Sequence, residues 1–123
     1  MAKLTGHDLR FHKMSTNDGS SKCDAYATGA STDTVWGVVF EIASVEKPRL
    51  DRAEGLGFGY DEKSVDILSA KGPLSAFTYI ASPEAIRPDL KPFAWYKQYV
   101  LDGAIEHELP PEYIEAIRTV ATG

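Results

Sequence analysis

The sequence predicts an α+β domain built on a small mixed or barrel-like sheet. Strand-like segments dominate the first two thirds of the chain, one helical segment is inserted among them, and two helical segments follow at the end. Strands grouped first, with helices inserted and added afterwards, are typical of α+β domains. The 123 residues suffice for one hydrophobic core, so residues 1–123 are expected to form a single domain.

Apolar and β-branched runs mark the expected strands. Residues 9–13 and 23–28 are short candidates, with turn-forming residues at 17–21 between them. Residues 34–42 (TVWGVVFEI) are continuously apolar, which predicts a central strand buried on both faces. Residues 60–68 and 74–81 predict two further strands, joined by a turn at Lys71-Gly72-Pro73.

Three helices are expected from capping residues and apolar spacing. Ser44 can cap a short helix that has Pro48 in its first turn and ends at Gly55. Residues 93–103 predict a second helix with Gly103 as its cap, and Pro110 or Pro111 starts a third. The apolar residues at near-helical spacing are Trp95, Tyr96, Tyr99, Val100 and Ala104 in the second helix and Tyr113, Ile114 and Ile117 in the third.

Composition narrows the classes of function. The net charge of −5, without a basic stretch interleaved with aromatics, argues against a nucleic-acid partner. We expect no membrane partner, because no segment is long and apolar enough to span a bilayer and the first residues lack a signal-peptide core. Cys23 is alone and cannot form an intramolecular disulfide, which favours a reducing, cytoplasmic location.

Several common chemistries find little support. His7, His12 and His107 have no metal-ligand spacing, so no metal site is expected. Cys23 could act as a nucleophile only beside a base. His12 is the only nearby histidine in the sequence, and no motif indicates that the two side chains pair. The glycines at 55, 57 and 59 follow a helix and precede a strand, which is the reverse of the order in a nucleotide-binding loop.

Glu54 is the strongest candidate for a catalytic group. The helical pattern breaks there into alternating glycines, where backbone can approach a ligand closely. A carboxylate at such a break can act as a general acid/base, although a solvated glutamate in a last helical turn is the plain alternative. Tyr60, Tyr79 and Tyr96 lie near the ends of three elements, where they can pack against the core, place a hydroxyl in a pocket, or do both.

Several blocks together resemble one family in order and spacing. These blocks are Val35 to Ile42, Leu50-Asp51 to Glu54-Gly55, Gly59-Tyr60, the strand with Tyr79, Trp95-Tyr96 before Gly103-Ala104, and Leu109-Pro110-Pro111-Glu112-Tyr113. In combination they are similar to gamma-glutamylcyclotransferases, the AIG2-like family, over most of the chain. Each block alone is weakly specific.

The resemblance implies a small β-barrel with flanking helices and a small-molecule γ-glutamyl substrate. It implies conversion of a γ-glutamyl amine or amino acid to 5-oxoproline with release of the amine and without a cofactor. Glu54 falls at the family's catalytic glutamate. The implied substrate-binding residues are Gly55, Gly59, Tyr60, Tyr79 and Tyr96.

One feature of the family is missing. Its members open with a strand and a Tyr-Gly-Ser-Asn loop whose backbone N–H groups grip the γ-glutamyl moiety, and no Tyr-Gly-Ser-Asn occurs here. Without the loop's N–H groups, we expect weak or absent activity. Without the first strand, its neighbour's edge is exposed, and we expect a homodimer through that edge. The alternatives are a non-catalytic binding or interaction domain on the same fold, and a different cyclising or amide-cleaving reaction on a related γ-glutamyl compound.

Overall fold

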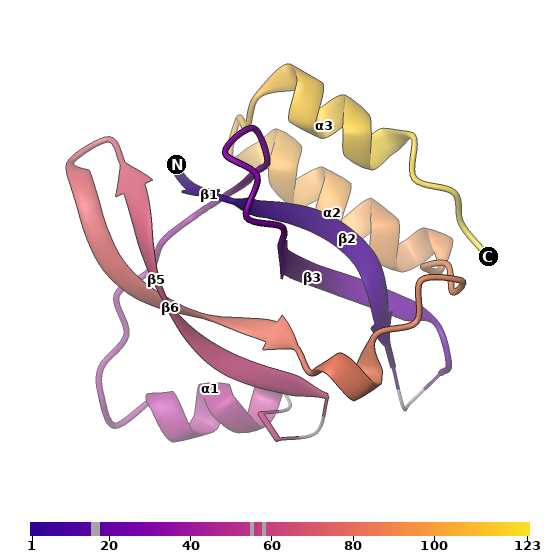
Figure 1. Cartoon of the computed structure of the whole chain (residues 1–123), viewed down its shortest axis with the longest axis horizontal. Coiled ribbons are helices and arrows are strands. Elements are labelled where there is room, and N and C mark those ends of the chain that lie inside the picture. Colours follow the sequence, from indigo (N-terminus) through magenta and orange to yellow (C-terminus); the bar gives the residue numbers. More distant parts are fainter. Residues whose placement is uncertain (16–17, 55, 58) are drawn as a thin grey trace.

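The computed structural model describes residues 1–15, 18–54, 56–57 and 59–123. Strands and helices occur in the order expected, which confirms the α+β class (Figure 1). The elements in the described part of the chain are β1 (Ala2–Thr5), β2 (His7–Met14), β3 (Ser21–Ala27), β4 (Thr34–Gly37), α1 (Lys47–Glu54), β5 (Tyr60–Ser69), β6 (Gly72–Ala81), the 3₁₀ turn η1 (Pro83–Ala85), α2 (Ala94–Glu106) and α3 (Pro111–Arg118).

The described strands form two sheets. One has the order β4-β1-β5-β6, and the other consists of β2 and β3; every ladder between these strands is antiparallel. Closure of the strands into one barrel is not seen among the described residues. A buried carboxylate links the sheets, because Asp24 of β3 accepts hydrogen bonds from the Ala81 N–H of β6 at 2.7 Å and from His12 of β2 at 2.6 Å.

Strand β1 is not predicted by the sequence. Its four residues show no strong apolar alternation, yet it pairs with β4 on one side and β5 on the other. Pairing on both edges imposes the extended conformation on a segment with weak local preference. The turn between β5 and β6 also differs slightly, because the expected turn residues Gly72 and Pro73 already belong to β6.

The prediction for residues 34–42 is wrong in length and burial. Strand β4 ends at Gly37, which pairs with Ala2 at the end of the β1 ladder. Beyond that point Val39 and Phe40 are exposed, Phe40 by 74%. The strand stops because its ladder with β1 runs out, and a strand needs a hydrogen-bonded neighbour.

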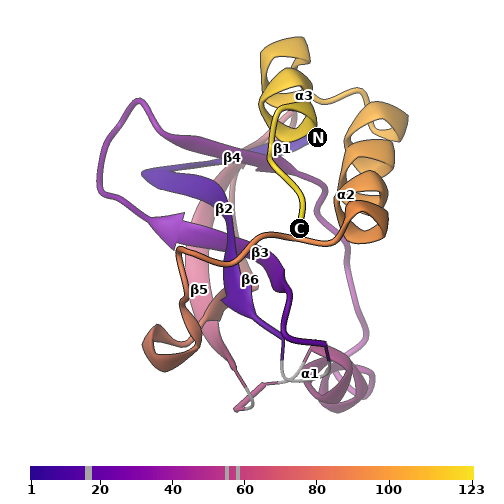
Figure 2. The ribbon, with the colours of Figure 1, turned by 90° about the vertical axis from the view of Figure 1, so that its right-hand side faces the viewer.

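Helices α2 and α3 lie together on one side of the molecule, and α1 lies at the opposite end (Figures 1 and 2). Gly103 does not cap α2, because the helix continues to Glu106 and the His107 N–H bonds back to the Gly103 carbonyl oxygen. The expected apolar face of α2 is only partly buried: Ala104 is in the core, whereas Trp95 and Tyr99 are exposed.

Within the described ranges, two apolar clusters form the core. One lies between α2, α3 and the strands, where Leu101, Leu109 and Ile117 pack with Phe11 and Trp36. The second lies on the four-stranded sheet and is built from Ala2, Val65 and Ile67, with Leu4 and Ala76 against it. The second cluster forms the floor of the cavity described next.

Candidate active site

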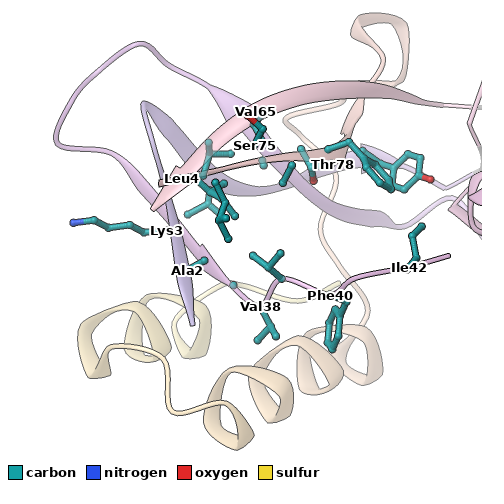
Figure 3. A pocket seen from close by; sticks show the side chains of 18 of the residues that line it. Ala2, Lys3, Leu4, Val38, Phe40, Ile42, Val65, Ser75 and Thr78 are labelled. Carbon is teal, nitrogen blue, oxygen red and sulfur yellow. The ribbon is translucent and has the colours of Figure 1, made fainter. Parts of the chain in front are cut away.

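An apolar cavity of about 770 Å³ lies beside the four-stranded sheet. Its walls come from β1, from β5 and β6, and from the segment 38–42 that follows β4 (Figure 3). In Figure 3 the side chain of Phe40 points away from β5 and β6. The polar side chains among the lining residues are Lys3, Glu41, Glu54, Ser75, Thr78 and Tyr79.

Glu54 lines this cavity from the last position of α1. It is exposed, and its carboxylate makes no hydrogen bond or ion pair with the described residues. Partial burial would raise the pKa of a carboxylic acid/base toward neutral pH, and the fold by itself does not bury Glu54. A carboxylate without an internal partner is available to a ligand that enters the cavity.

Tyr79 lines the same cavity from β6, and its hydroxyl donates a hydrogen bond to Asp51 of α1. Lys47 donates to both Asp51 oxygens, at 3.0 and 3.1 Å, and also to Glu62 of β5. Partial burial and the Asp51 carboxylate raise the pKa of Tyr79 to about 12, so its hydroxyl keeps its proton. The hydrogen bond from Tyr79, followed by Lys47, lowers the pKa of Asp51.

Tyr60 and Tyr96 lie together at a different place, on strand β3. The Tyr60 hydroxyl donates to the Cys23 carbonyl oxygen at 2.8 Å, and the Cys23 N–H donates to the Tyr96 hydroxyl at 3.1 Å. Burial is the main cause that raises the pKa of each tyrosine. Neither side chain lines the cavity, so the structure separates these two tyrosines from Tyr79.

The glycine turn after α1 connects the two places. Gly57 and Gly59 have φ values of 80° and 109°, which favour glycine strongly, and Gly59 leads into Tyr60. Gly55, an expected substrate-binding residue, lies outside the described residues. Burial is the largest cause that raises the pKa of Tyr60, and the charge of Glu54 adds to it, so Glu54 lies within electrostatic reach of Tyr60.

Two residues near these groups are missed by the sequence reasoning. Asp51 lies one helical turn before Glu54, and the i, i+3 spacing is a signal that could have identified it as a neighbour. Lys13 is buried, and its ammonium nitrogen lies 4.6 Å from the centre of the Tyr60 ring. No sequence signal separates Lys13 from an ordinary strand lysine, because its burial depends on packing against Tyr60, 47 positions away.

Cys23 and the potential metal ligands have the following surroundings. Burial is the main cause that raises the pKa of Cys23 to about 11, so its thiol stays protonated at neutral pH. The His12 ring is bound to Asp24 rather than to the thiol. No group of three His, Cys, Asp or Glu side chains in the described ranges could hold a metal ion. Likewise, no helix there is long and apolar enough to cross a membrane.

Comparisons with known proteins identify the class to which this fold belongs. Residues 34–117, more than half of the chain, match the model of the AIG2-like family. The protein therefore belongs to the AIG2-like family. No curated protein matches the sequence.

Solved structures share the fold. A human protein described as uncharacterized and a gamma-glutamyl cyclotransferase each superpose with a TM-score of 0.85, at 24% and 23% identity; both matches cover 99% of this chain and 73% of the other. YkqA from Bacillus subtilis superposes with a TM-score of 0.81 at 23% identity, over 99% of this chain and 45% of the other. These likenesses establish the fold.

Proposed function

We propose that this protein is a gamma-glutamylcyclotransferase, which converts a γ-glutamyl amine or γ-glutamyl amino acid to 5-oxoproline and releases the amine. The observation that carries the proposal is Glu54, whose carboxylate lines an apolar cavity and has no partner among the described residues. Membership of the AIG2-like family and the fold shared with a gamma-glutamyl cyclotransferase support this class of reaction.

The proposed reaction is an intramolecular displacement. Glu54 takes a proton from the substrate's α-ammonium group, and the freed amine attacks the γ-carbonyl carbon. The new C–N bond closes the five-membered ring, the original amide C–N bond breaks, and the protonated Glu54 returns its proton to the leaving amine. The ring nitrogen gives up its second proton through solvent, and the released amine takes up a proton to leave as an ammonium ion. Because both reacting groups belong to one molecule, the protein's main task is to hold the folded rotamer.

The other expected site residues take binding roles in this proposal. The Tyr79 hydroxyl, held by Asp51, faces the substrate from the cavity wall. Gly55 and Gly59 let backbone approach the substrate, and Tyr60 and Tyr96 bind it from the β3 side. The hydroxyls of Tyr60 and Tyr96 now bond the Cys23 backbone, so their rings would contact the ligand more readily than their hydroxyls.

The test is 5-oxoproline release from a panel of γ-glutamyl amines and γ-glutamyl dipeptides. Removing a general acid/base typically lowers the rate by about 10²–10⁴-fold, so release should fall by this factor in Glu54→Gln. Glu41→Gln is the matched control, because Glu41 lines the same cavity and is also exposed. Release that persists in Glu54→Gln, or that falls equally in both variants, would remove Glu54 from the catalytic role.

A second candidate function is a binding domain that pairs with another copy of the chain. The segment 38–42 carries exposed apolar side chains beside the cavity, with Phe40 74% exposed. Among the described residues, no ladder partner continues beyond Gly37 and no backbone hydrogen bond to residues 38–42 is found. We propose a homodimer through this edge, because unpaired strand edges associate with other chains.

We also propose a cytoplasmic location, where the single Cys23 would stay reduced.

A further inference from the structure

Lys13 is a buried cation at the glycine turn. The residue is only 7% exposed, and its position in β2 pairs with Lys22 of β3 and bridges to Ile86. Its side chain runs between the turn and the Tyr60 ring. A methyl group on Gly59 would lie 2.7 Å from Lys13 Cε and 2.9 Å from Nζ, so the glycine makes room for the ammonium group.

The ammonium of Lys13 has no negative partner in the described part of the chain. No carboxylate oxygen there lies within 4.0 Å of it, and it donates no hydrogen bond to a described residue. Its described contact is with the face of the Tyr60 ring. A buried charge without a partner is unfavourable, which makes Lys13 a candidate for binding an anionic ligand.

A second cation, Lys22, lies near Lys13. Lys22 lies 4.5 Å from the centre of the Tyr96 ring and 4.6 Å from that of Trp95. Burial first, and then the charge of Lys22, lower the pKa of Lys13. Lys22 has its own counter-ion in Asp18, at 3.4 Å, whereas Lys13 has none among the residues that the structure describes. An anion bound at Lys13 would relieve both the burial of its charge and the repulsion from Lys22.

Lys13 and the proposed acid/base lie near the same turn, Glu54 at the end of α1 and Lys13 against Gly59. Lys13 lies over the ring of Tyr60, and Glu54 is within electrostatic reach of the same tyrosine. In a γ-glutamyl substrate the α-carboxylate and the α-amine are attached to the same carbon. A group that holds the carboxylate therefore also fixes the amine from which Glu54 must take a proton.

We infer that Lys13 binds the α-carboxylate of the glutamyl moiety. This assignment rests on the proposed function for the identity of the ligand. Lys13 could recognise either of two carboxylates in a γ-glutamyl dipeptide. One belongs to the glutamyl moiety and the other to the leaving amino acid. The tests below separate the two.

The first experiment measures binding of 5-oxoproline and of its neutral carboxamide by calorimetry. 5-Oxoproline contains only the glutamyl carboxylate, and a charge-assisted contact should give a preference for it of about 10- to 100-fold over the carboxamide. Lys13→Met and Lys13→Gln should lose that preference and keep an unchanged or raised Tm, because they remove an unpaired buried charge. Lys71→Met, at an exposed turn, is the matched control and should keep the preference.

The assignment is overturned if both Lys13 variants keep the preference, or if the natural protein shows none. It is also overturned if the variants bind 5-oxoproline normally but no longer distinguish γ-glutamylglycine from γ-glutamylmethylamide, because Lys13 would then bind the leaving group. Carboxylate preference without 5-oxoproline release would keep this inference and reject the proposed function. Release of 5-oxoproline that depends on Glu54, without a preference for the carboxylate, would keep the proposed function and reject the role of Lys13.

Discussion

Tyr60 and Tyr96 bind the same residue, Cys23, through opposite sides of its backbone. One hydroxyl accepts from the Cys23 N–H and the other donates to the Cys23 carbonyl oxygen, so both backbone groups are satisfied by side chains from distant parts of the chain. The two tyrosines thereby connect β5 and α2 to strand β3. The same contacts bring both rings close to the lysines of β2 and β3.

Removing either hydroxyl should destabilise the protein. Tyr60→Phe or Tyr96→Phe leaves one backbone group of Cys23 without its partner, which costs about 1–3 kcal/mol in the free energy of unfolding. Urea denaturation measures the change. Tyr99→Phe is the control, because Tyr99 is 73% exposed, and it should change stability by less than about 0.5 kcal/mol. Equal stability of all three variants would show that the Cys23 contacts contribute nothing.

Asp24 should be among the residues to which stability is most sensitive. Its buried carboxylate binds the His12 ring and the Ala81 N–H, and thus holds the two sheets together. Removing one partner of a buried pair costs about 3–5 kcal/mol, which we expect for Asp24→Ala in thermal or urea unfolding. Asp8→Ala breaks only the exposed pair with Arg10 and should cost less than about 1 kcal/mol. A small effect of Asp24→Ala would mean that the sheets are held by packing alone.

Cys23 should react slowly in the native state. Burial is the main cause that raises its pKa to about 11, so the thiolate fraction at pH 8 is about 100-fold lower than that of an ordinary cysteine. Alkylation by iodoacetamide at pH 8, followed by mass spectrometry, should therefore be at least about 100-fold slower in the native protein than in urea. Because the folded pKa is raised, the folded state binds more protons. Stability should fall between about pH 8.5 and 11, and Cys23→Ala should reduce that fall.

The Tyr79 hydrogen bond to Asp51 should make the free energy of unfolding depend on pH in the acid range. The bond is the largest cause that lowers the pKa of Asp51. A carboxyl group with a lowered pKa in the folded state stabilises the fold fully at pH values above its ordinary pKa of about 3.9. This contribution is lost as the pH falls through the lowered pKa. Tyr79→Phe should therefore be less stable than the natural protein at neutral pH, and the difference should shrink below about pH 4. A difference that is constant with pH would assign the effect to packing.

The same pair should matter for turnover. If Asp51 orients the Tyr79 hydroxyl, Asp51→Asn should lower kcat/KM for 5-oxoproline release by roughly tenfold, the size expected for one misplaced hydrogen bond. Tyr79→Phe should remove the same interaction, so the double variant should be no slower than Tyr79→Phe alone. Additive losses in the double variant would show that Asp51 acts independently of Tyr79.

The open edge after β4 gives a prediction about assembly. Light scattering should show a dimer, and Phe40→Asp should shift it to monomer, since the new charge would be buried in the interface. Val45→Asp is the control, because Val45 is 79% exposed but does not line the cavity. Monomers at all concentrations in the natural protein would reject the proposed dimer.

Much of the fold could be predicted from local pattern. Strands β5 and β6 and the starts of α2 and α3 follow from apolar spacing, turn residues and prolines, which act within a few positions. Strand β1 could not, because its conformation depends on β4 and β5 beside it. The length of β4 was overestimated for the same reason: its residues favour a strand, but its partner ends at Ala2.

The candidate site, too, was predictable only in part from local sequence. Sequence alone pointed to Glu54 at the break between helix and glycines, and to three tyrosines at the ends of elements. Only tertiary packing decided that Tyr79 shares a cavity with Glu54, and that Tyr60 and Tyr96 meet at Cys23. Packing also decided that Lys13 is buried between the Tyr60 ring and Gly59. The physical reason is range: caps, turns and periodicity depend on neighbours in the chain, whereas burial and hydrogen-bond partners depend on which distant segments the fold brings together.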